Sequence, residues 1–287
     1  MTTTDIQIAI CGSAGDGTIA AGDILRNAVA QAGYRVISFD VYPPEIRGFG
    51  KCIARLRITT EQAYSLKRHS DVLVSLDDSH TMPHLDEVRD DGAVIYESKP
   101  VAQLAEGEHL SAHVRPGQIP YALPIRELSE KTTGSNRSRN LVILGFIAGL
   151  FGLPVTPFRQ VIGKKFGKQG QAVVSRNQAA FDIGVQTGQS SFQLDNVTFY
   201  PPLTSAGDSK SSRIAMLSGN AAVVQGCLDA GLATFFGYPI TPATSIMERL
   251  ATELPKRGKR LLQTEDEISA IAAAIGAGYA GARAATA

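Results

Sequence analysis

The sequence is poor in cysteine and in charge, and each shortage removes a class of function. Its three cysteines, Cys11, Cys52 and Cys227, are far apart and form no Cys-x-x-Cys pair, so we do not expect an iron–sulfur or zinc site built by this chain alone. Charged residues make up 19% of the chain and the formal net charge is +1, which gives no reason to expect nucleic acid as a partner. No apolar run approaches the ~20 residues that span a bilayer, and residues 1–5 do not begin a signal peptide. We therefore expect a soluble, cytoplasmic protein without a membrane partner.

Along the first part of the chain, short apolar runs alternate with segments whose apolar residues have helical spacing. The runs at residues 6–11, 35–41, 51–58, 71–76 and 93–96 predict strands. Helices are predicted between residue 19 and Gly33, around residues 81–88, and at residues 140–151, where an almost wholly apolar helix suits a packed interface. Strands interleaved with helices predict an α/β fold with a mostly parallel sheet.

A change of composition marks a boundary between two domains. Residues 187–212 are rich in serine, glycine and proline, as linkers are. Helices are predicted again at 220–230, at 242–254 and from 265 onward, with strands at 233–236 and 260–263. We therefore expect a first domain at 1–186, a linker at 187–212 and a second domain at 213–287. Because these few elements cannot close an α/β domain, we expect the sequence to be cut short inside it.

Two loops of the first domain are candidate binding elements. The turn Gly12–Gly17, which includes Gly15, joins a strand to a helix, where phosphates often bind. The glycines of this turn have the order GxxGxG rather than the GxGxxG of dinucleotide-binding loops. Asp16 also brings a negative charge to the place where a phosphate would bind, so a tight structural turn is favoured over a phosphate site. The loop Tyr42–Gly48 carries Arg47, which could bind a phosphate, a carboxylate or a neighbouring subunit, or simply be solvated.

Two motifs of the second domain each have a structural and a functional interpretation. Thr241 followed by Pro242 is a good helix start, which explains both residues. Alternatively, the hydroxyl and the free helix amides face an anionic substrate at the carboxyl end of a strand. Thr264 and Glu267 have the spacing of a capping box. Alternatively, Glu267 opens a helix of small residues, enters a buried cleft and stays partly protonated.

Taken together, these motifs resemble those of the 2-oxoacid:ferredoxin oxidoreductases. GYPITPAT (Gly237–Thr244) and QTEDEISAIAAAIGAGYAGARAATA (Gln263–Ala287) are similar to the alpha subunit. The glycine turn, YPPEIRG (Tyr42–Gly48) and the NLVILG helix resemble the gamma domain. The chain thus resembles a fused gamma–alpha subunit, most like the 2-oxoglutarate members. One departure is the segment Ser13–Gly17 (SAGDG), where the family usually has a glycine pair and glutamine.

The resemblance implies a fold, a reaction and a set of site residues. A gamma domain would precede the start of a pyrimidine-type, thiamine-diphosphate-binding domain. The reaction would convert a 2-oxoacid, CoA and oxidised ferredoxin reversibly into acyl-CoA, CO₂ and reduced ferredoxin. Glu267 would contact the aminopyrimidine ring and favour its imino tautomer, and Thr241 would lie near the substrate carboxylate. Tyr238, Pro239 and Ile240 would contact the cofactor.

The resemblance also implies partners. A beta subunit would hold the diphosphate, its Mg²⁺ and a [4Fe-4S] cluster, and two heterodimers would associate. Arg47 and Gly15 would contact CoA or a subunit interface. Two other functions remain open on the residues alone: a nicotinamide or flavin dehydrogenase based on the glycine turn, and a non-catalytic assembly subunit in which both motifs only begin helices.

Overall fold

The computed structural model describes residues 3–13, 15–41, 51–99, 109–191, 216–240 and 242–287. Its contacts divide the chain into two compact units, Met1–Ile214 and Ala215–Ala287, which we describe separately. Arg47 with its loop, and Thr241, lie outside the described residues. The first residues of the predicted linker are helical, because a long helix runs on to Gln189, while residues 192–212 lie outside the description. No helix in the described ranges is long and apolar enough to cross a bilayer.

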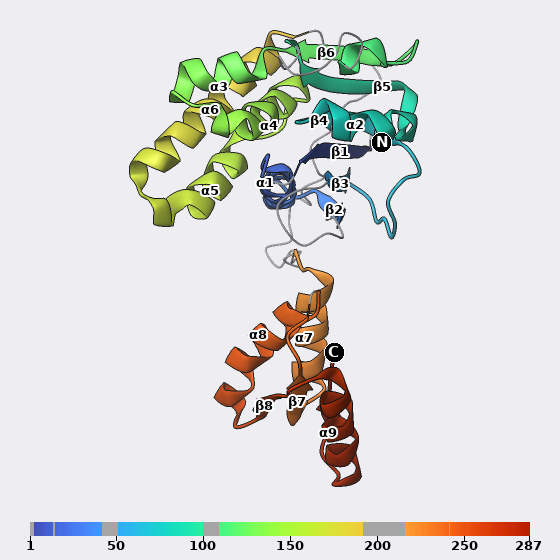
Figure 1. The fold of residues 1–287 in the computed structure, drawn as a ribbon. Coiled ribbons are helices and arrows are strands. Elements are labelled where there is room, and N and C mark those ends of the chain that lie inside the picture. Colours follow the sequence, from blue (N-terminus) through green and yellow to red (C-terminus); the bar gives the residue numbers. More distant parts are fainter. Residues whose placement is uncertain (1–2, 14, 42–50, 100–108, 192–215, 241) are drawn as a thin grey trace, which may run out of the picture. The chain divides into compact units, whose positions relative to one another are not determined.

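The first unit is built on a six-stranded sheet with the order β2-β3-β1-β4-β5-β6 (Figure 1). Strands β1, β4, β5 and β6 run parallel, whereas β3 is antiparallel to both β1 and β2. The mostly parallel sheet predicted from the sequence is therefore confirmed, with one reversed strand inside it. The strands are β1 (Asp5–Ser13), β2 (Arg35–Val41), β3 (Lys51–Thr59), β4 (Ser70–Ser75), β5 (Val88–Glu97) and β6 (Ile119–Leu123).

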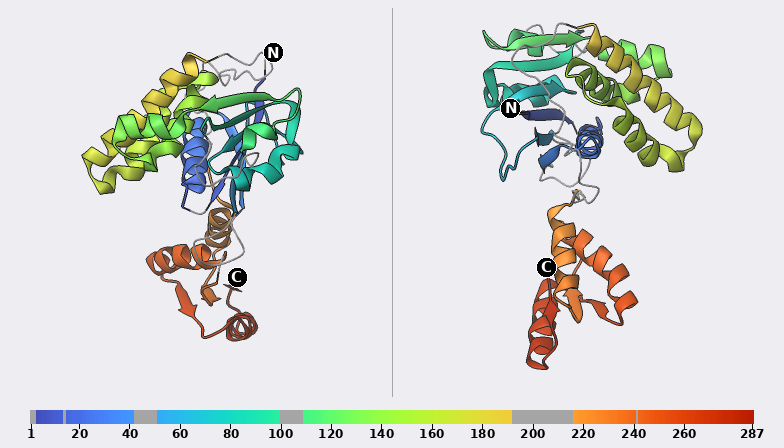
Figure 2. Two further views of the ribbon diagram at one scale, coloured as in Figure 1. Left: turned by 45° about the horizontal axis from the view of Figure 1, so that its top comes forward. Right: turned by 180° about the vertical axis from the view of Figure 1, so that it is seen from behind.

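Helices cover the two faces of this sheet unequally (Figure 2). The larger core joins one face to α1, α4, α5 and α6, and the smaller core lies under α2 and two short 3-10 helices, η1 and η2. The helices are α1 (Thr18–Gln31), α2 (Asp78–Thr81), η1 (Met82–Glu87), η2 (Leu110–Ala112), α3 (Ile125–Thr133), η3 (Asn136–Ser138), α4 (Arg139–Leu150), α5 (Val155–Phe166), η4 (Gly167–Gln169) and α6 (Gln171–Gln189).

Helix α4 is buried along almost its whole length, because α6 packs directly on its backbone. Two glycines of α4, Gly145 and Gly149, face Gly184 and Gly188 of α6. A Cβ atom added at any of them would lie closer than 3.0 Å to a backbone atom of the other helix. The helices therefore touch backbone to backbone, and the apolar sequence predicted to form a packed interface does so.

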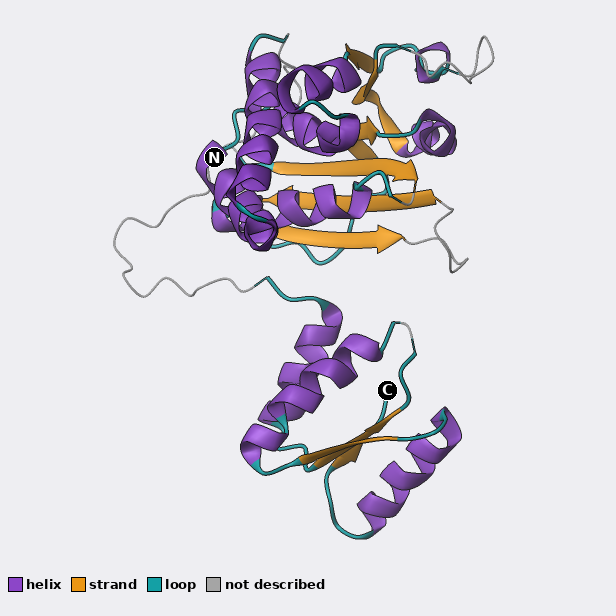
Figure 3. Cartoon of the chain, turned by 60° about the vertical axis from the view of Figure 1, so that its left-hand side comes forward, coloured by secondary structure: helices purple, strands orange, loops and turns teal. Residues whose placement is uncertain are grey.

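The second unit is a small parallel α/β arrangement with the strand order β8-β7-β9. Figure 3 shows α7 and α8 on one side of the three strands and α9 on the other. Phe235 of β7 packs with Leu250 of α8 in the core. The elements are α7 (Gly219–Asp229), β7 (Thr234–Gly237), α8 (Thr244–Glu253), η5 (Pro255–Arg257), β8 (Arg260–Gln263), α9 (Glu267–Tyr279) and β9 (Ala284–Ala285).

Candidate functional site

In the second unit, two sequence motifs meet at the carboxyl ends of neighbouring strands. Strands β7 and β8 are parallel, with Gly237 opposite Gln263. Tyr238, Pro239 and Ile240 follow β7, and Glu267 begins α9 after β8. The fold therefore brings the first motif and the start of the second to one edge of the sheet, where ligands of parallel sheets bind.

The start of α9 differs from the predicted capping box. Asp266 is the N-cap, and its carboxylate accepts a 2.7 Å hydrogen bond from the Ser269 backbone N–H. Hydrogen bonds from Ser269 hold the pKa of Asp266 below its ordinary value. Thr264 still belongs to the sheet, because its N–H donates to the Gly237 carbonyl at 2.9 Å. The prediction that Thr264 and Glu267 form a capping box is wrong.

Glu267 lies in the first turn of α9, where its charge complements the helix dipole but takes part in no capping bond. Its side chain is exposed and has no hydrogen bond or ion pair to any residue that the structure describes. Apolar side chains at the same edge of the sheet are also uncovered: Tyr238 is 39% exposed, Ile240 47% and Ile268 77%. An unpaired carboxylate beside apolar surface can bind a heteroaromatic ring by a hydrogen bond at its edge and contact with its face.

The helix after β7 also begins later than predicted. It starts at Thr244 with Ala243 as N-cap and no side-chain cap. The predicted start of this helix at Pro242 is therefore wrong, while Thr241 itself lies outside the described residues. Asn220 holds this region from α7, with its amide donating to the Pro242 carbonyl and to the Ser245 hydroxyl, both at 2.8 Å.

In the first unit, the glycine turn is filled by its own aspartate. The Asp16 carboxylate accepts the Ser13 N–H at 2.9 Å and forms an ion pair with Arg139. Gly17 adopts φ 81°, and a Cβ there would lie 2.5 Å from Asn140. Gly15 has φ 99° and open space around it. The turn is thus explained by tight packing, and its occupied amide gives no support to a dinucleotide-binding loop.

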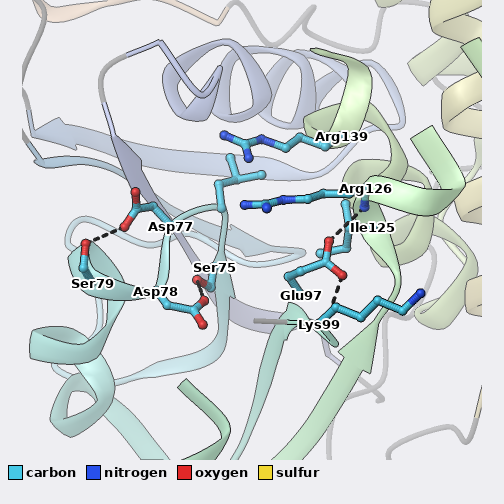
Figure 4. A pocket seen from close by; sticks show the side chains of 10 residues that line it. Ser75, Asp77, Asp78, Ser79, Glu97, Lys99, Ile125, Arg126 and Arg139 are labelled. Carbon is cyan, nitrogen blue, oxygen red and sulfur yellow. Dashed lines mark hydrogen bonds between the residues drawn. The ribbon is translucent and has the colours of Figure 1, made fainter. Parts of the chain in front are cut away.

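A cavity of about 310 Å³ lies beside this turn, at the carboxyl ends of β4 and β5 (Figure 4). Its acidic side chains are already used within the fold. Asp77 caps α2 by accepting the His80 N–H, and Asp78 accepts the Leu110 N–H. Glu97 accepts the Arg126 N–H at 2.8 Å. The lining residues are Ser75, Leu76, Asp77, Asp78, Ser79, Glu97, Lys99, Ile125, Arg126 and Arg139.

The remaining charged groups of this cavity are cationic. Arg126 and Arg139 both line it, and in Figure 4 their side chains point in the same direction. Arg139 is paired with Asp16, and Lys99 with Glu127 at 2.7 Å. The Arg126 guanidinium has no hydrogen bond or ion pair to a residue of the described chain. Two neighbouring guanidinium groups, one of them unpaired, suit a phosphate or a carboxylate.

A serine next to this cavity is not an activated nucleophile. The Ser13 hydroxyl donates to Asp77 at 2.9 Å, and it lies 2.6 Å from Nδ1 of His80. Because the Ser13 hydroxyl donates its one hydrogen bond to Asp77, the His80 ring donates to the Ser13 oxygen. His80 is therefore not placed as the base that removes the hydroxyl proton. Burial alone would raise the pKa of Asp77, but hydrogen bonds from Ser79, Ser13 and the His80 amide outweigh burial and keep the pKa below its ordinary value.

The described residues offer no metal site of their own. No group of three or more histidine, cysteine, aspartate or glutamate side chains in these ranges is arranged to hold a metal ion. Cys11 and Cys52 are buried and Cys227 is half-buried. Burial raises the pKa of the Cys11 thiol to about 12, which leaves it protonated and unreactive.

Two family models match the chain. One, described as pyruvate ferredoxin/flavodoxin oxidoreductase, matches residues 7–187. The other, described as the thiamine-diphosphate-binding part of pyruvate flavodoxin/ferredoxin oxidoreductase, matches residues 225–287. The first match covers well over half of the chain, and the second contains Glu267 and residues 238–240.

Named relatives agree with these matches. The chain is 27% identical to subunit alpha of 2-oxoacid:ferredoxin oxidoreductase 2 from Aeropyrum pernix, over 98% of this chain and 50% of the relative. A 2-oxoglutarate synthase subunit KorA from Methanocaldococcus jannaschii is 49% identical over 26% of this chain and 20% of its own length. The chain therefore spans about half the length of the relative that it matches from end to end.

A solved structure is also similar along the chain. It is described as 2-oxoglutarate:ferredoxin oxidoreductase from Magnetococcus marinus with 2-oxoglutarate, coenzyme A and succinyl-CoA bound. The identity is 32% and the TM-score 0.85, over 99% of this chain and 47% of that one.

Proposed function

The chain belongs to the pyruvate ferredoxin/flavodoxin oxidoreductase family, and we propose that it forms part of a CoA-acylating 2-oxoacid:ferredoxin oxidoreductase. The reaction joins a 2-oxoacid and CoA, releases CO₂ and passes the electrons to oxidised ferredoxin, reversibly. The proposed substrate is 2-oxoglutarate and the product succinyl-CoA. In support, the similar Magnetococcus marinus enzyme is described with both molecules bound.

One observation carries this proposal: Glu267 is a free carboxylate at the carboxyl edge of a parallel sheet. Asp266 does the capping of α9, so no capping hydrogen bond requires a glutamate at position 267; its charge in the first turn adds only the modest attraction of a carboxylate to the helix dipole. The segment that contains it matches the thiamine-diphosphate-binding model. The uncovered apolar surface of Tyr238 and Ile240 beside the neighbouring strand fits the face of an aromatic ring.

The chain's own residues have defined tasks in this proposal. Thiamine diphosphate, when bound, supplies the electron sink that decarboxylation of a 2-oxoacid requires. Glu267 shares a proton with a ring nitrogen of the aminopyrimidine and so keeps the amino group in the form that accepts a proton. Tyr238, Pro239 and Ile240 hold the ring and exclude water from it. Thr241, which follows them in sequence, is assigned to the substrate carboxylate.

The proposed CoA site is at the edge of the first unit. Arg139 is paired with Asp16 of the turn that contains Gly15, and Arg126 lines the same cavity, with no partner for its guanidinium within the described residues. A phosphate of CoA would take the place of that missing partner and accept hydrogen bonds from both arginines. Arg47, which lies outside the described residues, is assigned to CoA or to a subunit contact.

Activity requires a partner subunit in this proposal. A beta subunit would provide the diphosphate site with its Mg²⁺ and a [4Fe-4S] cluster. Relatives are named as subunits of such enzymes. We further propose a cytoplasmic dimer of heterodimers that delivers electrons to ferredoxin.

The decisive experiment replaces Glu267 by glutamine in the full complex. Proton exchange at C2 of bound thiamine diphosphate should slow by ~10²–10⁴, the usual contribution of acid–base assistance, while cofactor content and thermal stability stay near wild type. Glu265→Gln is the matched control, because Glu265 is also exposed and comes from the same turn; its exchange rate should not change. A wild-type exchange rate in Glu267→Gln would refute the assignment.

A further inference from the structure

Positive charge is concentrated in one part of the first unit. Residues 131–181 contain eight lysines and arginines and no aspartate or glutamate, although the whole chain carries a net charge of only +1. Four of these cations, Lys164, Lys165, Lys168 and Arg176, come from the short stretch in which α5 ends, η4 forms and α6 begins. We call residues 164–176 the basic turn.

The cations of the basic turn are exposed, and two of the four have no partner within the described chain. All four side chains are exposed. Lys165 pairs with Asp23 at 3.1 Å, and Arg176 donates to a backbone carbonyl of its own helix. Lys164 and Lys168 have no hydrogen bond or ion pair to a described residue. A Cβ added at Gly167 or Gly170 would meet nothing within 4 Å, so the described chain leaves this surface free.

The composition of the basic turn distinguishes between kinds of partner. None of the large apolar side chains that are exposed in the described chain lies in it, and lysine is depleted in the centre of permanent interfaces. Its one aromatic residue, Phe166, packs against the core and is not free to stack on bases, as single-stranded nucleic acid would require. Charge without apolar anchors fits a partner that associates briefly and is guided by electrostatics.

We propose that the basic turn docks the acidic surface of the protein that accepts electrons from the enzyme. This inference rests on the proposed function, because that reaction requires a protein acceptor that binds and leaves in every cycle. The lysines raise the rate of encounter with an acidic acceptor, and the effect is screened by salt because the charges are exposed.

The test uses the complete enzyme with its partner subunit and two electron acceptors, an acidic ferredoxin and methyl viologen. In Lys164→Glu/Lys168→Glu, kcat/KM for ferredoxin at low salt should fall about tenfold or more, within the range that electrostatic steering provides. Its dependence on salt should also weaken. Turnover with methyl viologen should stay within twofold of wild type. Arg257→Glu/Lys259→Glu, an exposed pair in the second unit, is the matched charge-reversal control and should leave both acceptors unaffected.

Each alternative result has a definite meaning. Unchanged ferredoxin kinetics in a variant that still reduces viologen would overturn the docking site and leave the proposed function intact. Equal losses with both acceptors would overturn it as well, because they would indicate damage to the reaction or the fold. A third result would also overturn the docking site. In it, the wild-type complex binds a random single-stranded RNA in a salt-sensitive way, and the variant loses this binding but keeps normal ferredoxin kinetics. A wild-type complex without 2-oxoacid-dependent viologen reduction would instead refute the proposed function itself.

Discussion

Replacing Gly145 by alanine should destabilise the first unit, although alanine is the better helix former. In the middle of α4, a Cβ at this position would collide with the backbone of α6 around Phe181 and Val185. The colliding atoms are backbone rather than the end of a flexible side chain, so α4 and α6 would have to move apart. Their apolar contacts, including Phe146 and Phe181 in the buried core, would loosen with them.

The size of the effect follows from two opposing contributions. Alanine in place of glycine favours a helix interior by about 0.8–1.0 kcal/mol. Overpacking a well-filled core costs typically about 1–3 kcal/mol, occasionally more, and contact between two backbones belongs at the upper end. We therefore expect a net loss of roughly 2 kcal/mol in the free energy of unfolding. For a unit of this size the midpoint would fall by roughly 4–8 °C, measurable by differential scanning calorimetry.

Gly163→Ala is the matched control and should have the opposite sign. Gly163 lies within α5, and the nearest atom to an added Cβ is a side-chain nitrogen of Gln178 at 3.9 Å. Only the helix preference remains, so stability should rise by roughly 0.5–1 kcal/mol. If Gly145→Ala were as stable as Gly163→Ala, the close approach of α4 and α6 would be wrong.

Two other predictions concern the cavity and the connection between the units. Arg126→Ala should raise the KM for CoA in the full complex about 10- to 100-fold, the value of a lost charged hydrogen bond of about 1.5–3 kcal/mol; an unchanged KM would remove Arg126 from the CoA site. Limited trypsin digestion should cut first at Lys210, in the stretch predicted to link the domains, and release a folded first unit. First cuts within residues 1–186 would contradict that boundary.

The sequence predicts the positions of several strands well. The predicted strands at 35–41 and 260–263 coincide with β2 and β8, and that at 71–76 is displaced by one residue from β4. Of these strands only β4 is buried at every position, as a continuous apolar run predicts, whereas β2 and β8 are partly exposed. Strand β5 begins earlier than predicted, at Val88, because the polar residues that follow Val88 break the apolar pattern.

Other elements have no clear local signal. Strand β6 is a short apolar run, but it contains Pro120, which in a sequence argues against a strand. The predicted helix at 81–88 divides into α2 and η1, because Pro83 cannot continue an α-helix. The cavity was not predicted either: Arg139 pairs with Asp16 across more than a hundred residues of sequence, and only the folded sheet brings these two together.

The boundary of α9 shows how a small error in secondary structure changes a functional argument. Thr264 and Asp266 are both good N-caps, and the sequence offers no means of choosing between them. The sheet decides: the Thr264 N–H is bound to Gly237 of the neighbouring strand, so the helix cannot begin until Asp266. With Thr264 as N-cap, the glutamate three residues later would be explained by capping alone. With Asp266 as N-cap, stability rests on the aspartate and Glu267 is free for a ligand. The separation of these two roles between adjacent acids makes Glu267→Gln a test of chemistry rather than of folding.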